Sequence, residues 1–196
     1  MLGAAPLAVL LGAAPLSAQS APEAPRRSFT DRLWVAFGLG GGQVQRWSDQ
    51  AARVHSTTVT GSLRFGVILS PAVRVGLEAN GWGVETSDLN DPSRGRTVNE
   101  LLVIAQWYPR RPAGLYLKGG YGWGSYGTNA AGEWGSSALG AVAVGAGWEL
   151  RVWRHGAFTL AADWARGPLG SVDNQVQTET GRRFRGWDVI VGAQWH

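Results

Sequence analysis

The sequence predicts an all-β protein, an eight-stranded antiparallel up-and-down transmembrane β-barrel, and three observations support this fold class. Eight segments alternate apolar and polar side chains with a period of two, as strands with two different faces do. The segments between them alternate strictly between long polar stretches and short turns, a pattern typical of barrels that span a membrane. The chain also ends on an alternating segment that has Trp near both ends.

This last segment, residues 187–196, shows the pattern most clearly. Its apolar face carries Trp187, Val189, Val191, Ala193 and Trp195. Its other face carries Asp188, Gly192, Gln194 and His196, with Ile190 as the one large apolar residue. An apolar face with an aromatic ring at each end is what a strand presents when it crosses a bilayer and turns its polar face to a lumen.

The N-terminal residues predict export. Residues 2–16 carry no charge and small residues follow up to Ala18, so we interpret residues 1–18 as a signal peptide. Residues 19–30 contain prolines and arginines and are expected to form a flexible periplasmic lead-in. Residues 31–196 then form one outer-membrane barrel domain. The sequence contains no Cys, which excludes disulfides and thiolate metal sites.

The strands and their connections follow in order along the barrel domain. Strands are expected at residues 32–40, 58–69, 73–84, 97–108, 115–126, 138–152, 157–165 and 187–196. Short turns at 70–72, 109–112 and 154–156 each contain Pro or Gly. Longer polar stretches at 41–57, 86–96, 127–135 and 166–183 are expected to be loops. Because the number of strands is even, both chain ends lie on one side of the membrane, predicted to be the periplasm.

Each of the first seven strands is justified by its own apolar face, which recurs at every second residue. In order, these faces run from Leu33 to Leu39, Val59 to Leu69, Val73 to Ala79, Leu101 to Trp107, Leu115 to Trp123, Val142 to Val152 and Phe158 to Trp164. The fourth strand is apolar on both faces near its middle. The prediction sets Leu101, Val103, Ala105 and Trp107 on its outward face, against Glu100, Leu102, Ile104 and Gln106.

Alternation alone does not decide which face is outside. A soluble lipocalin-like ligand-binding barrel, the alternative at the level of the fold, keeps apolar side chains inside and polar ones outside. In this sequence the small residues share a face with the charges, as in the run Gly120, Gly122, Gly124, Ala141, Ala143, Gly145 and Gly147. A narrow lumen needs small residues and a solvent-facing surface does not, so the apolar faces are predicted to point outward.

Three motifs in the second half of the chain resemble a known family. Residues 116–122, Tyr-Leu-Lys-Gly-Gly-Tyr-Gly, are similar to the Tyr-x-Lys-Gly-Gly-x-Gly strand of small outer-membrane β-barrel domains of the eight-stranded OmpA/OmpX-like type. Residues 145–151 resemble that family's Gly-x-Gly-Tyr-Glu-Leu-Arg strand with Trp148 in place of Tyr, and residues 192–196 resemble its aromatic-His ending. The resemblance implies the fold, the outer membrane and assembly by the barrel-assembly machinery, and it implies no single activity.

The predicted inward charges nearly cancel. They comprise four cations and five carboxylates: Arg64, Arg74, Lys118, Arg151, Glu78, Glu100, Glu149, Asp163 and Asp188. Eight strands leave an interior just wide enough for side chains to fill, so we interpret these residues as a plug of ion pairs and hydrogen bonds. The alternative is a selectivity element in a narrow pore for small solutes.

The exterior predicts contacts with lipid. Outward aromatic residues are expected at the two membrane interfaces: Trp107, Trp123, Trp148, Trp164, Trp187 and Trp195. Arginines in or beside the long loops are predicted to contact lipopolysaccharide phosphates: Arg94, Arg96, Arg166, Arg182 and Arg183. Nucleic acid is not an expected partner because the chain is exported and lacks a long basic run, and we expect a monomer.

A lipid-modifying barrel enzyme is the catalytic alternative, and it requires a nucleophile beside a base. His55 in the first long loop has three candidate partners nearby in sequence: Ser48, Asp49 and Ser56. Such residues are also ordinary in polar loops, and no His or carboxylate group in the sequence has metal-ligand spacing. We therefore expect no enzyme activity, metal or cofactor. The predicted role is structural, adhesive or surface-interacting.

Overall fold

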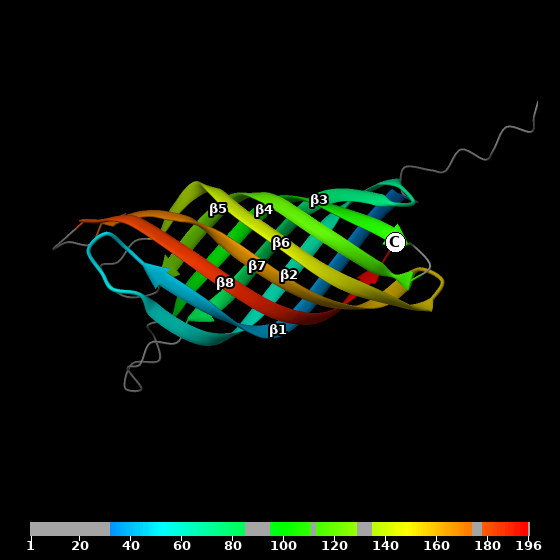
Figure 1. Cartoon of the computed structure of the whole chain (residues 1–196), viewed down its shortest axis with the longest axis horizontal. Coiled ribbons are helices and arrows are strands. Elements are labelled where there is room, and N and C mark those ends of the chain that lie inside the picture. Colours follow the sequence, from blue (N-terminus) through cyan, green and yellow to red (C-terminus); the bar gives the residue numbers. More distant parts are fainter. Residues whose placement is uncertain (1–31, 85–94, 111–112, 129–134, 174–177, 196) are drawn as a thin grey trace, which may run out of the picture.

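A computed structural model describes residues 32–84, 95–110, 113–128, 135–173 and 178–195. Eight strands form one closed antiparallel barrel in chain order, which confirms the predicted fold class (Figure 1). They are β1 Leu33–Trp47, β2 Val54–Ser70, β3 Val73–Val84, β4 Arg96–Arg110, β5 Leu115–Thr128, β6 Ser136–Trp153, β7 Gly156–Asp173 and β8 Thr178–Trp195. No helix in these ranges is long and apolar enough to cross a membrane. The expected signal peptide, the lead-in, Arg94 and His196 lie outside the described residues.

The barrel has two distinct ends. At the turn end, on the right in Figure 1, lie the β2–β3, β4–β5 and β6–β7 connections and the C-terminus. At the opposite end, which we call the loop end, lie the β1–β2, β3–β4, β5–β6 and β7–β8 connections. The even number of strands therefore brings the start of β1 and the end of β8 to the same end of the molecule.

The first and last strands close the barrel through a long ladder. Their pairing runs from Val35 opposite Trp195 to Trp47 opposite Arg183. The Phe37 ring stacks on Trp195 on the outside of this seam, with 5.4 Å between the ring centroids. Closure leaves no unpaired strand edge, which is the condition for a sheet to exist in lipid.

Two hairpins at the loop end are longer than the sequence analysis predicts. Pairing between β1 and β2 continues to Arg46 opposite Val54, and pairing between β7 and β8 continues to Asp173 opposite Thr178. The predicted loops at 41–57 and 166–183 are therefore wrong, because most of these residues are in strands. Backbone pairing needs no apolar side chains, so a ladder can continue where the apolar pattern stops. Residues 174–177, between β7 and β8, lie outside the described residues.

The two faces of the wall are as predicted, with apolar side chains outside and polar ones inside. On β6, for example, Val144 is 55% exposed while Glu149, an inward residue of the same strand, is 6% exposed. The fourth strand follows the same rule, since Glu100, Leu102 and Gln106 are all buried inside. The wall thus reverses the arrangement of a soluble barrel.

Small residues on the inner wall make room for large side chains opposite. A Cβ atom added at Gly147 would lie 2.3 Å from the Tyr116 ring. One added at Gly145 would lie 1.8 Å from the Asp163 carboxylate. Neither distance is possible for real atoms, so the glycines on β6 are what allow Tyr116 and Asp163 to occupy the interior.

Candidate functional site

A buried lysine lies at the centre of the polar interior. Lys118 on β5 donates hydrogen bonds to both carboxylate oxygens of Glu78 on β3, at 2.6 and 2.7 Å, and to Asp163 on β7 at 2.7 Å. Arg64 on β2 lies 4.0 Å from Glu78 and donates a hydrogen bond to the Tyr116 hydroxyl at 3.1 Å. We call these residues the lysine cluster. Buried charges require such partners, and here the partners come from four different strands.

A second ion pair lies nearer the turn end. Arg74 on β3 makes a two-pronged contact with Glu149 on β6, at 2.7 and 3.3 Å. The Tyr108 hydroxyl and the Gln194 amide donate further hydrogen bonds to the same carboxylate. The Arg74 guanidinium also lies over the Tyr108 ring, 4.5 Å from its centroid. Glu149 therefore holds β3, β4, β6 and β8 together at one point.

Two further carboxylates lie on the loop side of the lysine cluster. Asp188 on β8 accepts hydrogen bonds from Thr60 at 3.2 Å and from Asn80 at 3.0 Å. Glu100 on β4 is 3% exposed, and its Oε2 atom has no hydrogen-bond partner among the described residues. The polar interior thus ends in a carboxylate that is incompletely satisfied.

Arg151 is the one predicted lumen charge that the structure contradicts. It is exposed near the turn end of β6, where Leu150 and Val152 are exposed as well. The strand runs past the rim of the barrel, so its inward-facing positions end at Glu149. Alternation predicts which face a residue occupies and not whether the barrel still surrounds it. Of the predicted lumen charges, three cations, Arg64, Arg74 and Lys118, and five carboxylates are buried inside.

Towards the loop end the interior becomes apolar. The Trp82 and Phe184 rings pack against each other with 5.8 Å between their centroids. Around them lie other buried members of the same cluster, Val44, Val84, Val98 and Leu169. We call these six residues the apolar plug. The plug lies on the loop side of the buried polar side chains.

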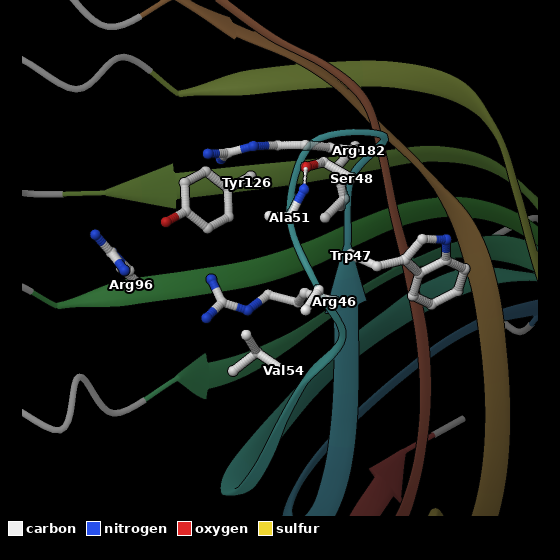
Figure 2. Close-up of a pocket in the computed structure, with 10 residues that line it drawn as sticks. Arg46, Trp47, Ser48, Ala51, Val54, Arg96, Tyr126 and Arg182 are labelled. Carbon is white, nitrogen blue, oxygen red and sulfur yellow. Dashed lines mark hydrogen bonds between the residues drawn. The ribbon is translucent and has the colours of Figure 1, made fainter. Parts of the chain in front are cut away.

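Above the apolar plug, at the loop end, lies a cavity of about 190 Å³. Three arginines from β1, β4 and β8 line it with Tyr126 of β5, as Figure 2 shows: Arg46, Arg96 and Arg182. The guanidinium groups of Arg182 and Arg46 both lie over the Tyr126 ring, 4.7 and 5.7 Å from its centroid. The remaining lining residues are Trp47, Ser48, Ala51, Ala52, Val54 and Leu169. We call this cavity the arginine pocket.

Sequence reasoning found Arg96 and Arg182 as loop arginines and missed Arg46 and Tyr126. Both missed residues occupy inward positions of strands, β1 beyond its predicted end and β5 at its last predicted residue. The signal that could have found them is the period of two, continued through the polar residues after Gly42. It places Val44 and Arg46 on the inward face.

The described residues do not bring together the nucleophile and base that a lipid-modifying enzyme requires. Ser48 and Asp49 lie in the β1–β2 connection, whereas His55 and Ser56 belong to β2. The Ser48 hydroxyl oxygen accepts hydrogen bonds from the backbone N–H groups of Gln50 and Ala51. Among the described residues no hydrogen bond joins His55 to a serine, and no three potential metal ligands gather in one place.

The predicted interface tryptophans all lie on the outer face. Trp107, Trp123, Trp148, Trp187 and Trp195 are exposed and Trp164 is half-buried. Trp164 and Trp187 are opposite each other on β7 and β8, and the next outward pair towards the loop end is Arg166 opposite Arg185. Arg183, one outward position further, is exposed too. Aromatic rings and arginines therefore form adjacent levels on this side of the barrel.

Comparisons with known proteins agree on the fold. No family model and no curated protein matches the sequence. Neisserial surface protein A is 11% identical, with 83% of this chain and 96% of that chain covered and a TM-score of 0.56. Ail, the attachment invasion locus protein of Yersinia pestis, is 14% identical, with 84% and 99% covered and a TM-score of 0.50. The architecture implied by the family resemblance is confirmed, and at these identities the likeness shows the fold alone.

Proposed function

We propose that this protein is an integral outer-membrane barrel with a side-chain-filled lumen and a structural or surface-interaction role. In this arrangement the turn end and both chain termini face the periplasm, and the loop end faces outward. The observation that carries the proposal is that the barrel has apolar side chains outside and polar ones inside, the opposite of a soluble barrel. Large apolar side chains are exposed on all eight strands, while ion pairs are buried within.

The exposed apolar surface is too extensive for a protein in water. Soluble monomers rarely expose contiguous apolar patches of more than a few hundred Å², and here the exposed rows continue around the closed wall from Phe37 on β1 to Val191 on β8. Lipid tails remove the cost of this exposure. A soluble ligand-binding barrel would have no use for it, and its interior would not be filled with charges.

A filled interior favours an anchor or surface-interaction protein over a pore. The lysine cluster and the Arg74–Glu149 pair bridge strands across the lumen, and the apolar plug closes the interior above them. Conduction through a narrow barrel requires a hydrated path with weakly bound sites. The residues present here instead bind one another.

We further propose that lipid phosphates of the outer leaflet bind the outer arginines at the loop end. Arg166 and Arg185 are directly opposite each other and both exposed, and like charges in this position are destabilising unless an anion lies between them. The adjacent tryptophans support a position of this pair near the lipid headgroups. The exposed ring of Trp195 at the other end supports recognition of the last strand by the barrel-assembly machinery.

Gel mobility and conductance of the refolded protein test the main proposal. We expect the mature chain to require detergent, to migrate faster unheated than boiled, and to give no steady current in a planar bilayer. A monodisperse monomer without detergent would contradict the membrane assignment. Steady conductance would favour the narrow pore, and turnover of added lipid would favour an enzyme.

The lipid contact is tested by the double variant Arg166→Gln/Arg185→Gln. Lipid A in mixed micelles should raise the temperature at which the wild-type band converts to the slow form, and the double variant should lose most of this rise. Arg110→Gln, at the turn end, is the matched control and should keep it. An equal loss in both variants would mean that overall positive charge, and not this pair, attracts the lipid.

A further inference from the structure

We infer that the arginine pocket is a binding site for a phosphate group, separate from the outer arginines proposed to contact lipid. Its first support is convergence. Side chains from four strands, β1, β4, β5 and β8, meet around one cavity (Figure 2). Among the described lining residues three are arginines and none is a carboxylate.

The second support is the unused hydrogen-bonding capacity of Arg46. Its guanidinium lies over the Tyr126 ring, and its Nε atom is buried without a hydrogen-bond partner among the described residues. A buried N–H donor normally has an acceptor, although the Arg46 residue as a whole is half-buried. Arg96 and Arg182 each have a further interaction of their own, so the argument rests on Arg46. A tetrahedral oxyanion in the cavity would supply the acceptor that Arg46 lacks.

The third support is a neutral donor opposite the arginines. Both acceptor positions of the Ser48 hydroxyl are occupied by backbone N–H groups, of Ala51 at 2.9 Å and Gln50 at 3.3 Å. A hydroxyl has one donor and two acceptor positions, so Ser48 has only its O–H left to offer to a ligand. A donor suits an anion and does not suit a cation.

The wall of the pocket is held in place before any ligand binds. The Gln50 side chain donates to the Thr180 hydroxyl at 3.1 Å and accepts from the Thr180 backbone N–H at 3.3 Å. The backbone N–H of Asp49 donates to the Thr180 carbonyl. These contacts tie the β1–β2 connection to β8, and therefore tie Ser48 to the strand that carries Arg182. Such preorganisation lowers the cost of binding.

The cavity fits the phosphate and a small part of the molecule that bears it. Trp47, Val54 and Leu169 add apolar surface to the lining of the cavity. The same chemistry can come from a lipid headgroup that reaches over the rim or from a soluble phosphorylated molecule. An outward-facing loop end, as in the proposed function, makes both sources accessible.

Calorimetric titration of the refolded full-length protein in zwitterionic detergent tests this inference. The probe is inorganic pyrophosphate, and lipid A in mixed micelles is the second probe. The variants are Arg46→Gln and, as the matched control, Arg166→Gln on the outer face. We expect Arg46→Gln to weaken binding of pyrophosphate about tenfold or more, since it removes charge-assisted hydrogen bonds, and Arg166→Gln to change it less than about twofold.

The two probes separate the sources of the phosphate. Binding of pyrophosphate that depends on Arg46 identifies a site for soluble phosphates, whereas Arg46-dependent binding of lipid A alone identifies a headgroup site. Wild-type affinity in Arg46→Gln for both probes, or equal losses in the two variants, would overturn the inference. Normal heat-dependent gel mobility of Arg46→Gln must accompany these results, and it keeps the outcome distinguishable from a failure of the membrane proposal.

Discussion

The interior of the barrel is filled in two different ways along its length. The half near the turn end is built from charges, with Lys118, Arg64 and Arg74 each held by carboxylates of other strands. The half near the loop end is built from apolar side chains around Trp82 and Phe184. The same eight strands enclose both halves, so the halves differ in the kind of contact that each interior makes.

The polar half specifies which strands face each other across the lumen. An ion pair is satisfied only in one arrangement, and Lys118 joins residues 40 and 45 positions away in sequence. Apolar contacts tolerate small shifts, so the apolar plug seals the barrel with less demand on geometry. The arginine pocket lies directly beyond the plug, which separates it from the buried carboxylates of the polar half.

Lys118→Met should produce the largest loss of stability among single changes in the interior. It leaves Glu78 and Asp163 buried without their shared cation, and breaking a buried pair in this way typically costs about 3–5 kcal/mol. Guanidinium unfolding in lipid vesicles, followed by tryptophan fluorescence, measures the change. A loss below about 1 kcal/mol would show that water reaches the lysine cluster, against the filled lumen.

The double variant Lys118→Met/Asp163→Asn is the control for that prediction. It removes the lysine together with one of its two carboxylates, while Glu78 keeps Arg64 at 4.0 Å, so it should recover part of the loss. If the double variant is as unstable as Lys118→Met, the lysine side chain contributes through packing and not through its charge.

Leu102→Ala tests apolar packing inside the barrel and should cost less, about 2–3 kcal/mol. Leu102 is completely buried, and truncation of such a residue leaves a cavity without exposing a charge; typical losses are about 2–5 kcal/mol. Leu101→Ala is the matched control on the same strand. Leu101 faces outward and is 47% exposed, so lipid can fill the space, and we expect a loss below about 1 kcal/mol in the same unfolding experiment. Equal losses would contradict the assignment of the two faces.

The sequence predicted the parts of this fold that depend on the period of two. Strand number, pairing order and the outward apolar face follow from alternation and from the lengths of connections. The small-residue argument chose the correct face, because Gly145 and Gly147 are required by the side chains opposite them. Because the inward face was chosen correctly, eight of the nine predicted lumen charges are buried inside.

Two features were harder to predict: where along the barrel axis each residue lies, and which side chains from distant strands meet. Alternation does not reveal where the barrel ends, so Arg151 was placed inside although it lies beyond the rim. The long hairpins looked like loops because polar residues lie on both of their faces. The arginine pocket depends on strand tilt and register, which bring Arg46 and Tyr126 together although they are 80 positions apart. No local pattern in the sequence encodes that meeting.

Glu100→Gln should have the smallest effect, and it sharpens the boundary between the two halves. Glu100 lies next to Leu102 on the inward face of β4. Its Oε2 atom has no hydrogen-bond partner among the described residues, and the buried polar residues include more carboxylates than cations. The amide keeps the shape and removes a surplus negative charge, so we expect unfolding to change by less than about 1 kcal/mol, with stabilisation the more natural direction. Glu149→Gln is the matched control. It weakens the two-pronged contact with Arg74 and should cost clearly more in the same measurement. If the two changes cost the same, Glu100 has a cationic partner in the membrane-bound protein, and the polar half extends further towards the loop end than its hydrogen bonds indicate.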